Sequence, residues 1–266
     1  MGNQFHSWQK LLFKIGFEKK EKEKISKNEY KIKNNSFFLD KNLQNKKIAV
    51  FFDVDDTLIN GQTQKLMISY FYQKKKINFT FLLKIYFWFL LYKIGFVSSG
   101  ASLMIKAYKL VEGIKIEEFK NFMLDLFEKR IKSRIYPQAI ERINFHKKKG
   151  HEIVLLSKSC KILIDIIKDY LDVSLSIATE LEVKNGILTG KINGAIIHRE
   201  EKLKIVKKLA PIKNWNLKES YAYGDHYSDL PFLKAVGNTC VVNPDRKLKK
   251  EAKRNNWKIF YWYFKP

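Results

Sequence analysis

The chain has only two cysteines, Cys160 and Cys240, among 266 residues. Neither has the spacing of a cysteine-based metal site, so that kind of centre is excluded. Both lie in apolar or helical contexts, and we expect two buried thiols rather than a disulfide, which fits a reducing compartment. A signal peptide is also missing, because the apolar run at residues 11–13 is too short and no small-residue cleavage site follows it. We therefore expect a cytoplasmic protein.

Acidic residues are scarce beside basic ones, with 27 Asp and Glu against 51 Lys and Arg, and the formal net charge is +24. An excess of this size is compatible with binding to nucleic acid, to anionic lipid or to an anionic substrate. The lysines are spread along nearly every segment, however, so we interpret most of the excess as a compositional bias. No zinc-finger spacing, aromatic RNA-binding pattern or recognition-helix unit occurs. We expect no specific nucleic-acid partner.

The pattern along the chain predicts three parts. Residues 1–45 form a basic leader, which we expect to be flexible, and its first apolar residues suit docking on the body of the protein or contact with an anionic membrane. Residues 46–62 and 146–266 alternate strands with helices, which predicts an α/β core with a Rossmann-like, mostly parallel sheet. Residues 63–145 appear helical almost throughout, and we expect an inserted all-helical cap at the carboxyl edge of the sheet.

Two local features refine this prediction. The dipeptide at residues 185–186, Asn-Gly, lies between apolar runs and predicts a β-hairpin over 181–193. The apolar stretch 79–97 is about as long as a bilayer span. Lys84 and Lys93 interrupt it, and each costs about 2.5 to 3.5 kcal/mol at the centre of a membrane helix. We interpret the stretch as a buried cap helix first, as a membrane-surface helix second and as a true span last.

The chemistry of the chain is concentrated after its first predicted strand. The apolar run 48–52 ends abruptly in Asp53, Asp55, Asp56 and Thr57. A buried strand cannot keep unpaired carboxylates, so the acids must lie at its carboxyl end, where open α/β sheets bind ligands. Two carboxylates two residues apart point to the same side and repel unless a cation or a shared proton relieves them. The alternative is that these residues only cap a helix.

Polar residues at three further places in the chain follow predicted strands or begin a helix. Ser157 comes directly after the apolar run 153–156, Lys202 lies at a helix start, and Asp225 and Asp229 follow the strand at 220–223. A hydroxyl, a lysine and two acid pairs at one sheet edge suit a phosphate and a hard cation such as Mg²⁺, which prefers carboxylate and phosphate oxygens. An aspartate at such a site can act as a nucleophile through an aspartyl-phosphate.

These residues, in this order, resemble the four motifs of the haloacid dehalogenase superfamily, subfamily IB, whose phosphoserine phosphatase-like members have a type 1 helical cap. The resemblance covers about residues 46–266, with the first motif at 53–57. It implies that Asp53 is the nucleophile and that Asp55 is the general acid and base. It implies that phosphate is bound by Thr57, Ser157 and Lys202, and that Mg²⁺ is bound by Asp53, the Asp55 backbone carbonyl, Asp225 and Asp229.

The chain departs from the family pattern at several positions. Lys158 and Ser159 follow Ser157 where phosphoserine phosphatases have two glycines, which argues against a phosphoserine substrate and leaves Ser159 as an alternative to Ser157. We expect His226 to be a loop residue at the rim of the site. Asp56 often is glycine in the superfamily, and here we expect it to cap a helix.

The function expected from these features is that of a Mg²⁺-dependent phosphomonoester hydrolase. Its substrate would be a small or lipid-linked phosphate ester. Alternatives are a phosphotransferase on the same fold and a non-catalytic module that binds a polyanion. All four motifs are intact, which argues against lost catalysis.

Overall fold

The computed structural model describes residues 46–77, 79–80, 83, 87, 90, 104–105 and 107–264. The leader 1–45 lies outside these residues, and so does most of the apolar stretch 79–97. Within the described part of the chain, no helix is long and apolar enough to cross a membrane. Residues 48–266 cluster as one compact unit, and the division into core and cap at residues 63 and 145 stays a prediction.

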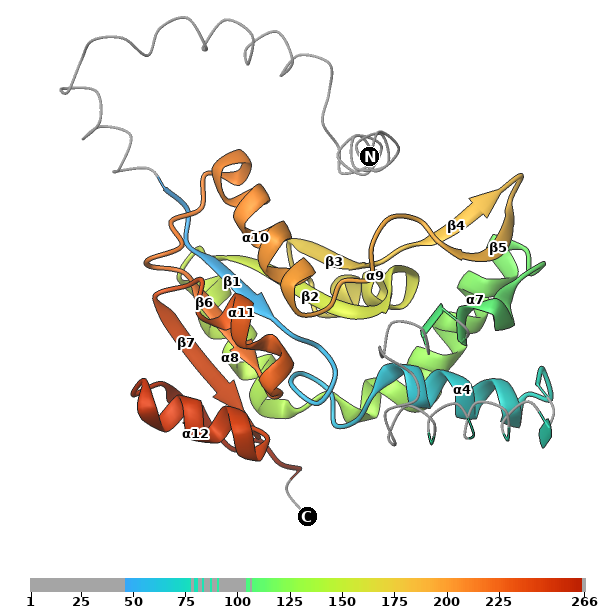
Figure 1. Ribbon diagram of the computed structural model, residues 1–266, viewed down its shortest axis with the longest axis horizontal. Coiled ribbons are helices and arrows are strands. Elements are labelled where there is room, and N and C mark those ends of the chain that lie inside the picture. The colour runs from blue at the N-terminus through green and yellow to red at the C-terminus, as the bar shows by residue number, and fades with distance from the viewer. Residues whose placement is uncertain are drawn as a thin grey trace, which may run out of the picture. The chain divides into compact units, whose positions relative to one another are not determined.

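A six-stranded sheet forms the centre of the described part of the chain (Figure 1). The strand order is β3-β2-β1-β6-β7-β8, and every neighbouring pair is parallel. The strands are β1 (Ala49–Phe52), β2 (Glu152–Cys160), β3 (Leu175–Thr179), β6 (Tyr221–Gly224), β7 (Asn238–Val242) and β8 (Lys258–Phe260). Because all six strands run the same way, their carboxyl ends share one edge. The predicted parallel α/β sheet is confirmed.

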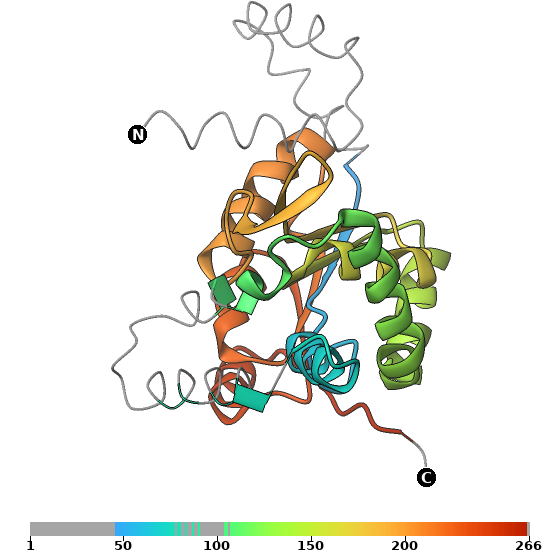
Figure 2. The same cartoon turned by 90° about the vertical axis from the view of Figure 1, so that its right-hand side faces the viewer.

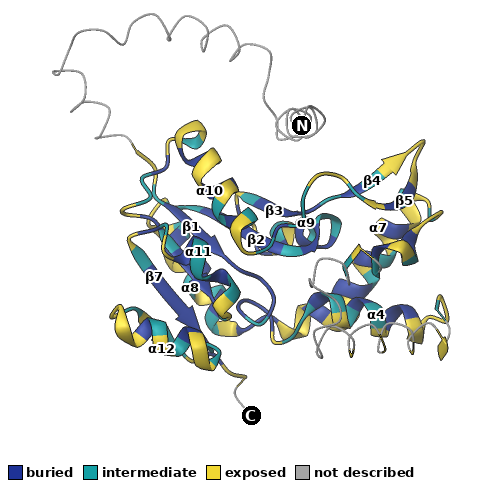
Figure 3. Cartoon of the chain, in the orientation of Figure 1, coloured by how far each residue is buried: buried dark blue, intermediate teal, exposed yellow. Residues whose placement is uncertain are grey.

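Helices cover both faces of the sheet, because its central strand is apolar on both sides. Phe51 and Phe52 of β1 are fully buried. The Phe51 ring contacts Trp215 edge to face, and the Phe52 ring lies against His146 on the opposite face. The covering helices are α8 (Pro137–Lys148), α9 (Lys161–Tyr170), α10 (Glu200–Lys213), α11 (Leu230–Leu233) and α12 (Arg246–Arg254). Figure 3 shows the strands of the sheet as mostly buried, with exposed residues on the outer helices.

The segment between β1 and α8 contains helices and connecting turns where it is described. It contains α4 (Thr63–Gln73), η1 (Lys109–Val111), α7 (Ile116–Leu126), the π-helical turn η2 (Phe127–Ile131) and η3 (Lys132–Arg134). The predicted hairpin is also present, as β4 (Leu181–Lys184) and β5 (Ile187–Ile192). Its turn residues Asn185 and Gly186 both have positive φ, 50° and 75°, as a type I′ turn requires.

The hairpin lies beside the helical segment in both views (Figures 1 and 2). The Gly113 N–H donates to the Leu188 carbonyl at 2.8 Å, and the Leu188 N–H donates to the Ile114 carbonyl at 2.9 Å. These bonds extend the hairpin with one strand-like stretch of the helical segment. The hairpin is therefore hydrogen-bonded to the segment that we expect to be the cap.

One strand boundary differs from the prediction. Ser157 does not follow β2 but lies within it, because β2 continues to Cys160 with a shift of register between Ser157 and Cys160. The run Ser-Lys-Ser has little strand propensity, but its buried hydroxyls have partners and Cys160 still pairs with Thr179. Tertiary contacts thus extend the strand. Both cysteines are buried and free, as predicted.

Candidate active site

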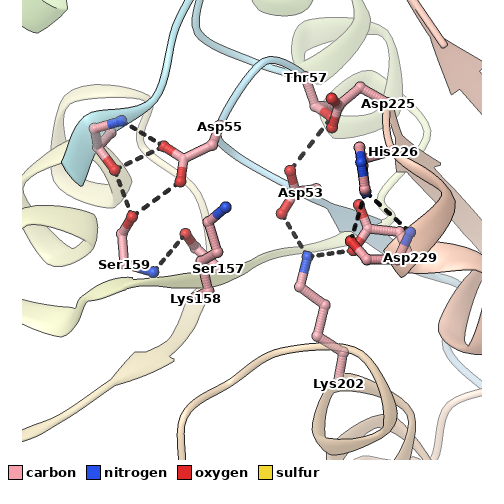
Figure 4. A network of polar contacts seen from close by, with 12 residues as sticks. Asp53, Asp55, Thr57, Ser157, Lys158, Ser159, Lys202, Asp225, His226 and Asp229 are labelled. Carbon is pink, nitrogen blue, oxygen red and sulfur yellow. Dashed lines mark hydrogen bonds and ion pairs between the residues drawn. The ribbon is translucent and has the colours of Figure 1, made fainter. Parts of the chain in front are cut away.

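The predicted site residues converge at the carboxyl edge of the sheet (Figure 4). Asp53 follows β1, Asp225 follows β6, and Lys202 lies in the first turn of α10. A cavity of about 290 Å³ is lined by five predicted site residues, namely Asp53, Asp55, Lys202, Asp225 and Asp229. The other two, Thr57 and Ser157, are fully buried beside it.

Strands β1 and β6 are in close contact next to the acids. The Asp53 N–H donates to the Tyr223 carbonyl at 2.9 Å, and the Phe52 ring stacks on the Tyr223 ring at 4.4 Å between centroids. Gly224 allows Asp229 to approach, because a Cβ at Gly224 would lie 3.3 Å from both the Cβ and Oδ2 of Asp229. Packing in the sheet therefore fixes the spacing of the carboxylates.

Lys202 is buried between two carboxylates. Its Nζ lies 2.5 Å from Asp53 Oδ1 and 2.8 Å from Asp229 Oδ1, and the residue is only 2% exposed. Burial alone would lower the pKa of Lys202, but the facing carboxylates of Asp229 and Asp53 raise it above its usual value. The lysine is therefore charged in the site, and it is not a residue of a solvated helix face.

A third carboxylate, that of Asp225, lies beside the two that pair with Lys202. Oxygens of Asp53, Asp225 and Asp229 lie within 4.8 Å of one another. Burial raises the pKa of Asp53 to about 6, although Lys202 opposes the shift. Burial, together with the charges of Asp53 and Asp229, raises the pKa of Asp225 to about 9. Clustered carboxylate oxygens suit a hard divalent cation, so these residues fit Mg²⁺.

Asp55 has a separate set of partners on the other side of the cavity. Its Oδ1 accepts from the N–H of Thr63 at 2.8 Å and from the Thr63 hydroxyl at 2.6 Å. Its Oδ2 accepts from the Ser159 hydroxyl at 3.0 Å, and burial raises the pKa of Asp55 above its usual value. Thr63 begins α4, so Asp55 does satisfy one helix N–H, as the capping alternative proposed. Asp56 is not the N-cap of the next described helix, because the N-cap residue of α4 is Gln62.

The two buried hydroxyls predicted to bind phosphate are held by other groups of the site. The Thr57 hydroxyl donates to Asp225 Oδ1 at 3.0 Å. The Ser157 Oγ accepts from the Ser159 N–H at 3.1 Å. Ser159, which the sequence left as an alternative to Ser157, instead contacts Asp55. The structure thus gives the two serines different places in one network.

His226 lies at the rim of the cavity, as predicted, and is exposed. Its Nδ1 accepts from the Ser228 N–H at 3.1 Å, and its Nε2 lies 3.4 Å from Asp245 Oδ2. Asp245 also accepts from the Leu248 N–H at 2.8 Å and caps α12. His226 is thus held by its own loop and by the start of α12.

Several residues of the site could not be predicted from the sequence. Thr63 is the main partner of Asp55, but a threonine at a helix start carries no distinguishing signal. His198 and Arg199 also line the cavity, and their only signal was their position shortly before Lys202. Lys158 was noted as a departure from the family pattern, and the structure places it in the cavity wall.

Comparisons with known proteins agree with this geometry. The chain is 28% identical over 218 residues to a probable phosphatase of Mycobacterium tuberculosis, covering 79% of this chain and 74% of that protein. It is 29% identical over 212 residues to a phosphoserine phosphatase of Methanocaldococcus jannaschii, covering 79% of this chain and 92% of that protein.

A protein of unknown function from Bordetella pertussis has the same fold in its crystal structure. Its TM-score is 0.75 at 20% identity, and the match covers 81% of this chain and 99% of that chain. The family model for haloacid dehalogenase-like hydrolases matches residues 50–234, which include every predicted site residue. This match spans well over half of the chain, and the chain therefore belongs to the haloacid dehalogenase-like hydrolases.

Proposed function

We propose that the protein is a Mg²⁺-dependent phosphomonoester hydrolase that acts through an aspartyl-phosphate on Asp53. The observation that carries this proposal is the arrangement of two carboxylates with different environments in one cavity. Asp53 is ion-paired with Lys202, whereas Asp55 is hydrogen-bonded to hydroxyl groups. Such a division separates a nucleophile from a general acid and base. The substrate would be a small or lipid-linked phosphate ester.

In the first half of the reaction, a carboxylate oxygen of Asp53 attacks phosphorus. The bond between phosphorus and the leaving oxygen breaks, and Asp55 gives its proton to that oxygen. The raised pKa of Asp55 supports this role, because burial keeps a proton on the carboxyl group to a higher pH than usual. The alcohol then leaves, and the phosphoryl group is bonded to Asp53.

In the second half, Asp55 acts as a base. It takes a proton from water, the water oxygen attacks phosphorus, and the Asp53 carboxylate is released with inorganic phosphate. The site then has the same protonation as at the start.

The surrounding residues bind and orient the phosphate. Lys202 lies beside Asp53 and offsets the charge of the phosphate oxygens, and the hydroxyls of Thr57 and Ser157 supply hydrogen bonds. Asp53, Asp225, Asp229 and the backbone carbonyl of Asp55 would hold Mg²⁺. The cation would neutralise charge on the phosphate and on the clustered carboxylates.

Hydrolysis of p-nitrophenyl phosphate tests this proposal. The parent protein should release nitrophenol with Mg²⁺ and lose that activity in EDTA. Asp53→Asn should lower kcat by more than about a thousandfold, because an amide is no nucleophile here. Asp56→Asn is the matched control. Asp56 has a φ of 58°, which asparagine tolerates, and no role in the reaction is proposed for it.

Two results would contradict the proposal. One is an Asp53→Asn protein that folds and still turns over at the parent rate. The other is a parent protein without Mg²⁺-dependent activity that binds nucleic acid in a salt-dependent manner, which would favour a polyanion-binding module instead.

A further inference from the structure

The cavity has a basic wall that the proposed reaction does not use. Lys158 of β2 lines it, and so do His198 and Arg199 from the stretch before α10. These residues come from two elements that are far apart in the sequence. They line the same cavity as Asp53 and Asp55.

The charged side chains of this wall are not held in ion pairs with other described residues. Lys202 is paired with Asp53 and Asp229, but Lys158 and Arg199 form no ion pair with any residue that the structure describes. Burial, followed by the charges of Lys158, Lys202, Arg199 and His226, lowers the pKa of His198 to about 4. The wall therefore presents an ammonium group, a guanidinium group and an imidazole that is neutral at neutral pH.

Lys158 lies on the side of the cavity where the leaving group would be. Its chain neighbour Ser159 donates to Asp55 Oδ2 at 3.0 Å, and of the charged groups that act on Asp55, Lys158 has the largest effect and lowers the pKa of this carboxyl. Asp55 is the group that would protonate the leaving oxygen. Lys202, in contrast, is bonded to Asp53, on the side of the transferred phosphate. Lys158 also lowers the pKa of Asp53, but less than Lys202 does, so the two lysines act mainly on different carboxylates.

The backbone at Arg199 supports a role for its side chain. Arg199 has φ 48° and ψ −116°, a conformation that glycine adopts readily and that is strained for a residue with a side chain. Its carbonyl accepts from the Lys202 N–H at 3.1 Å, so the strained turn leads directly into the helix that carries Lys202. An arginine here, where glycine would be more stable, is a sign of function.

We propose that Lys158, His198 and Arg199 form a subsite for a second anionic group, a carboxylate or a second phosphate, on the leaving alcohol. This inference rests on the proposed hydrolase function and specifies its substrate class. Ammonium and guanidinium groups form strong charge-assisted hydrogen bonds with both anions, and the imidazole N–H of His198 adds a neutral donor. His226 is not included, because it is already held by Ser228 and Asp245.

Two pairs of esters, each differing by one anionic group, test the subsite. The first pair is 3-phosphoglycerate and glycerol 3-phosphate, which differ by a carboxylate. The second is fructose 1,6-bisphosphate and fructose 6-phosphate, which differ by a phosphate. Phosphate release is measured with Mg²⁺ for each ester and for p-nitrophenyl phosphate, which has no second anion. In at least one pair, we expect the parent to favour the ester with the second anionic group by about tenfold or more in kcat/KM.

Two variants and one control connect this preference to the wall. Lys158→Met and Arg199→Gly should each reduce the preference by about tenfold, mainly through a higher KM for the ester with the second anionic group. Arg199→Gly should also keep or raise Tm, because it removes the strained conformation. Lys253→Met removes one positive charge from the exposed end of α12 and should leave the preference unchanged.

The possible failures are distinguishable. A parent that hydrolyses p-nitrophenyl phosphate but shows no preference in either pair overturns the subsite and leaves the proposed function intact. Variants that lower kcat/KM equally for both members of a pair also overturn it, because the wall would then act on the transferred phosphate. A parent that hydrolyses none of these esters contradicts the proposed function itself.

Discussion

Replacing Lys202 by methionine should destabilise the protein strongly in the absence of divalent cations. The ammonium is within 2.8 Å of both Asp53 Oδ1 and Asp229 Oδ1, and all three side chains are at most 10% exposed. Removing one partner of a buried ion pair costs about 3 to 5 kcal/mol, because the remaining charge is left uncompensated. For a domain of this size the corresponding fall in Tm is about 6 to 20 °C.

The pH dependence of this loss has a definite sign. Without Lys202, the pKa of Asp53, already raised by burial to about 6 in the parent, should rise further. The folded variant then binds a proton that the unfolded chain releases near pH 4. Because the unfolded state binds fewer protons in this range, the free energy of unfolding falls as pH rises. The difference between parent and variant should therefore be smaller at pH 5 than at pH 8.

Chemical denaturation in EDTA at pH 5 and pH 8 measures both effects. Lys204→Met is the matched control, because Lys204 lies on the same helix but pairs with Glu201 at the surface, and it should not change Tm measurably. If Lys202→Met unfolds within about 1 kcal/mol of the parent at pH 8, the electrostatic reasoning is wrong. A loss of equal size at both pH values would contradict the assigned role of the carboxylates.

Three further predictions concern the same site. In EDTA, the free energy of unfolding of the parent should fall as the pH rises from 4 to 6, because the pKa of Asp53 in the folded protein is raised to about 6. Mg²⁺ should restore more stability at pH 8 than at pH 5, and thermal melts measure both effects. Asp55→Asn should lower kcat by about a hundredfold or more and make phosphoenzyme accumulate in a burst experiment, because water loses its base. Gly224→Ala should cost about 1 to 3 kcal/mol and lower activity, because its Cβ would meet Asp229 at 3.3 Å. Denaturation and a kinetic assay check the two effects.

The fold, and the meeting of the candidate site residues at one edge of the sheet, could be predicted from the sequence because both depend on local patterns. The fully apolar run of β1 and the alternation of strands with helices predict a parallel sheet. The carboxyl edge of the sheet then brings together residues that are far apart in the sequence. Thr57, which follows β1, donates to Asp225, which lies 168 residues later in the chain. The Asn185-Gly186 turn was predictable for the same local reason.

The remaining features depend on tertiary contacts. Strand β2 continues through Ser157 because buried partners replace the solvation of its polar side chains. The bonds from Thr63 and Ser159 to Asp55 join residues up to 104 positions apart, and no periodicity indicates them. The basic wall could not be predicted from the sequence either. Lys158 and Arg199 are two of 51 basic residues, and only the folded chain brings them to one cavity.

The central claim is that Asp53 carries the phosphoryl group, and a trapping experiment tests it most directly. The protein is mixed with a substoichiometric labelled phosphate ester and Mg²⁺, quenched in acid within one turnover, and digested for peptide mapping. The account predicts label on the peptide that contains Asp53, and none in the Asp53→Asn variant. Turnover without any labelled peptide, or label on a peptide that lacks Asp53, would contradict it.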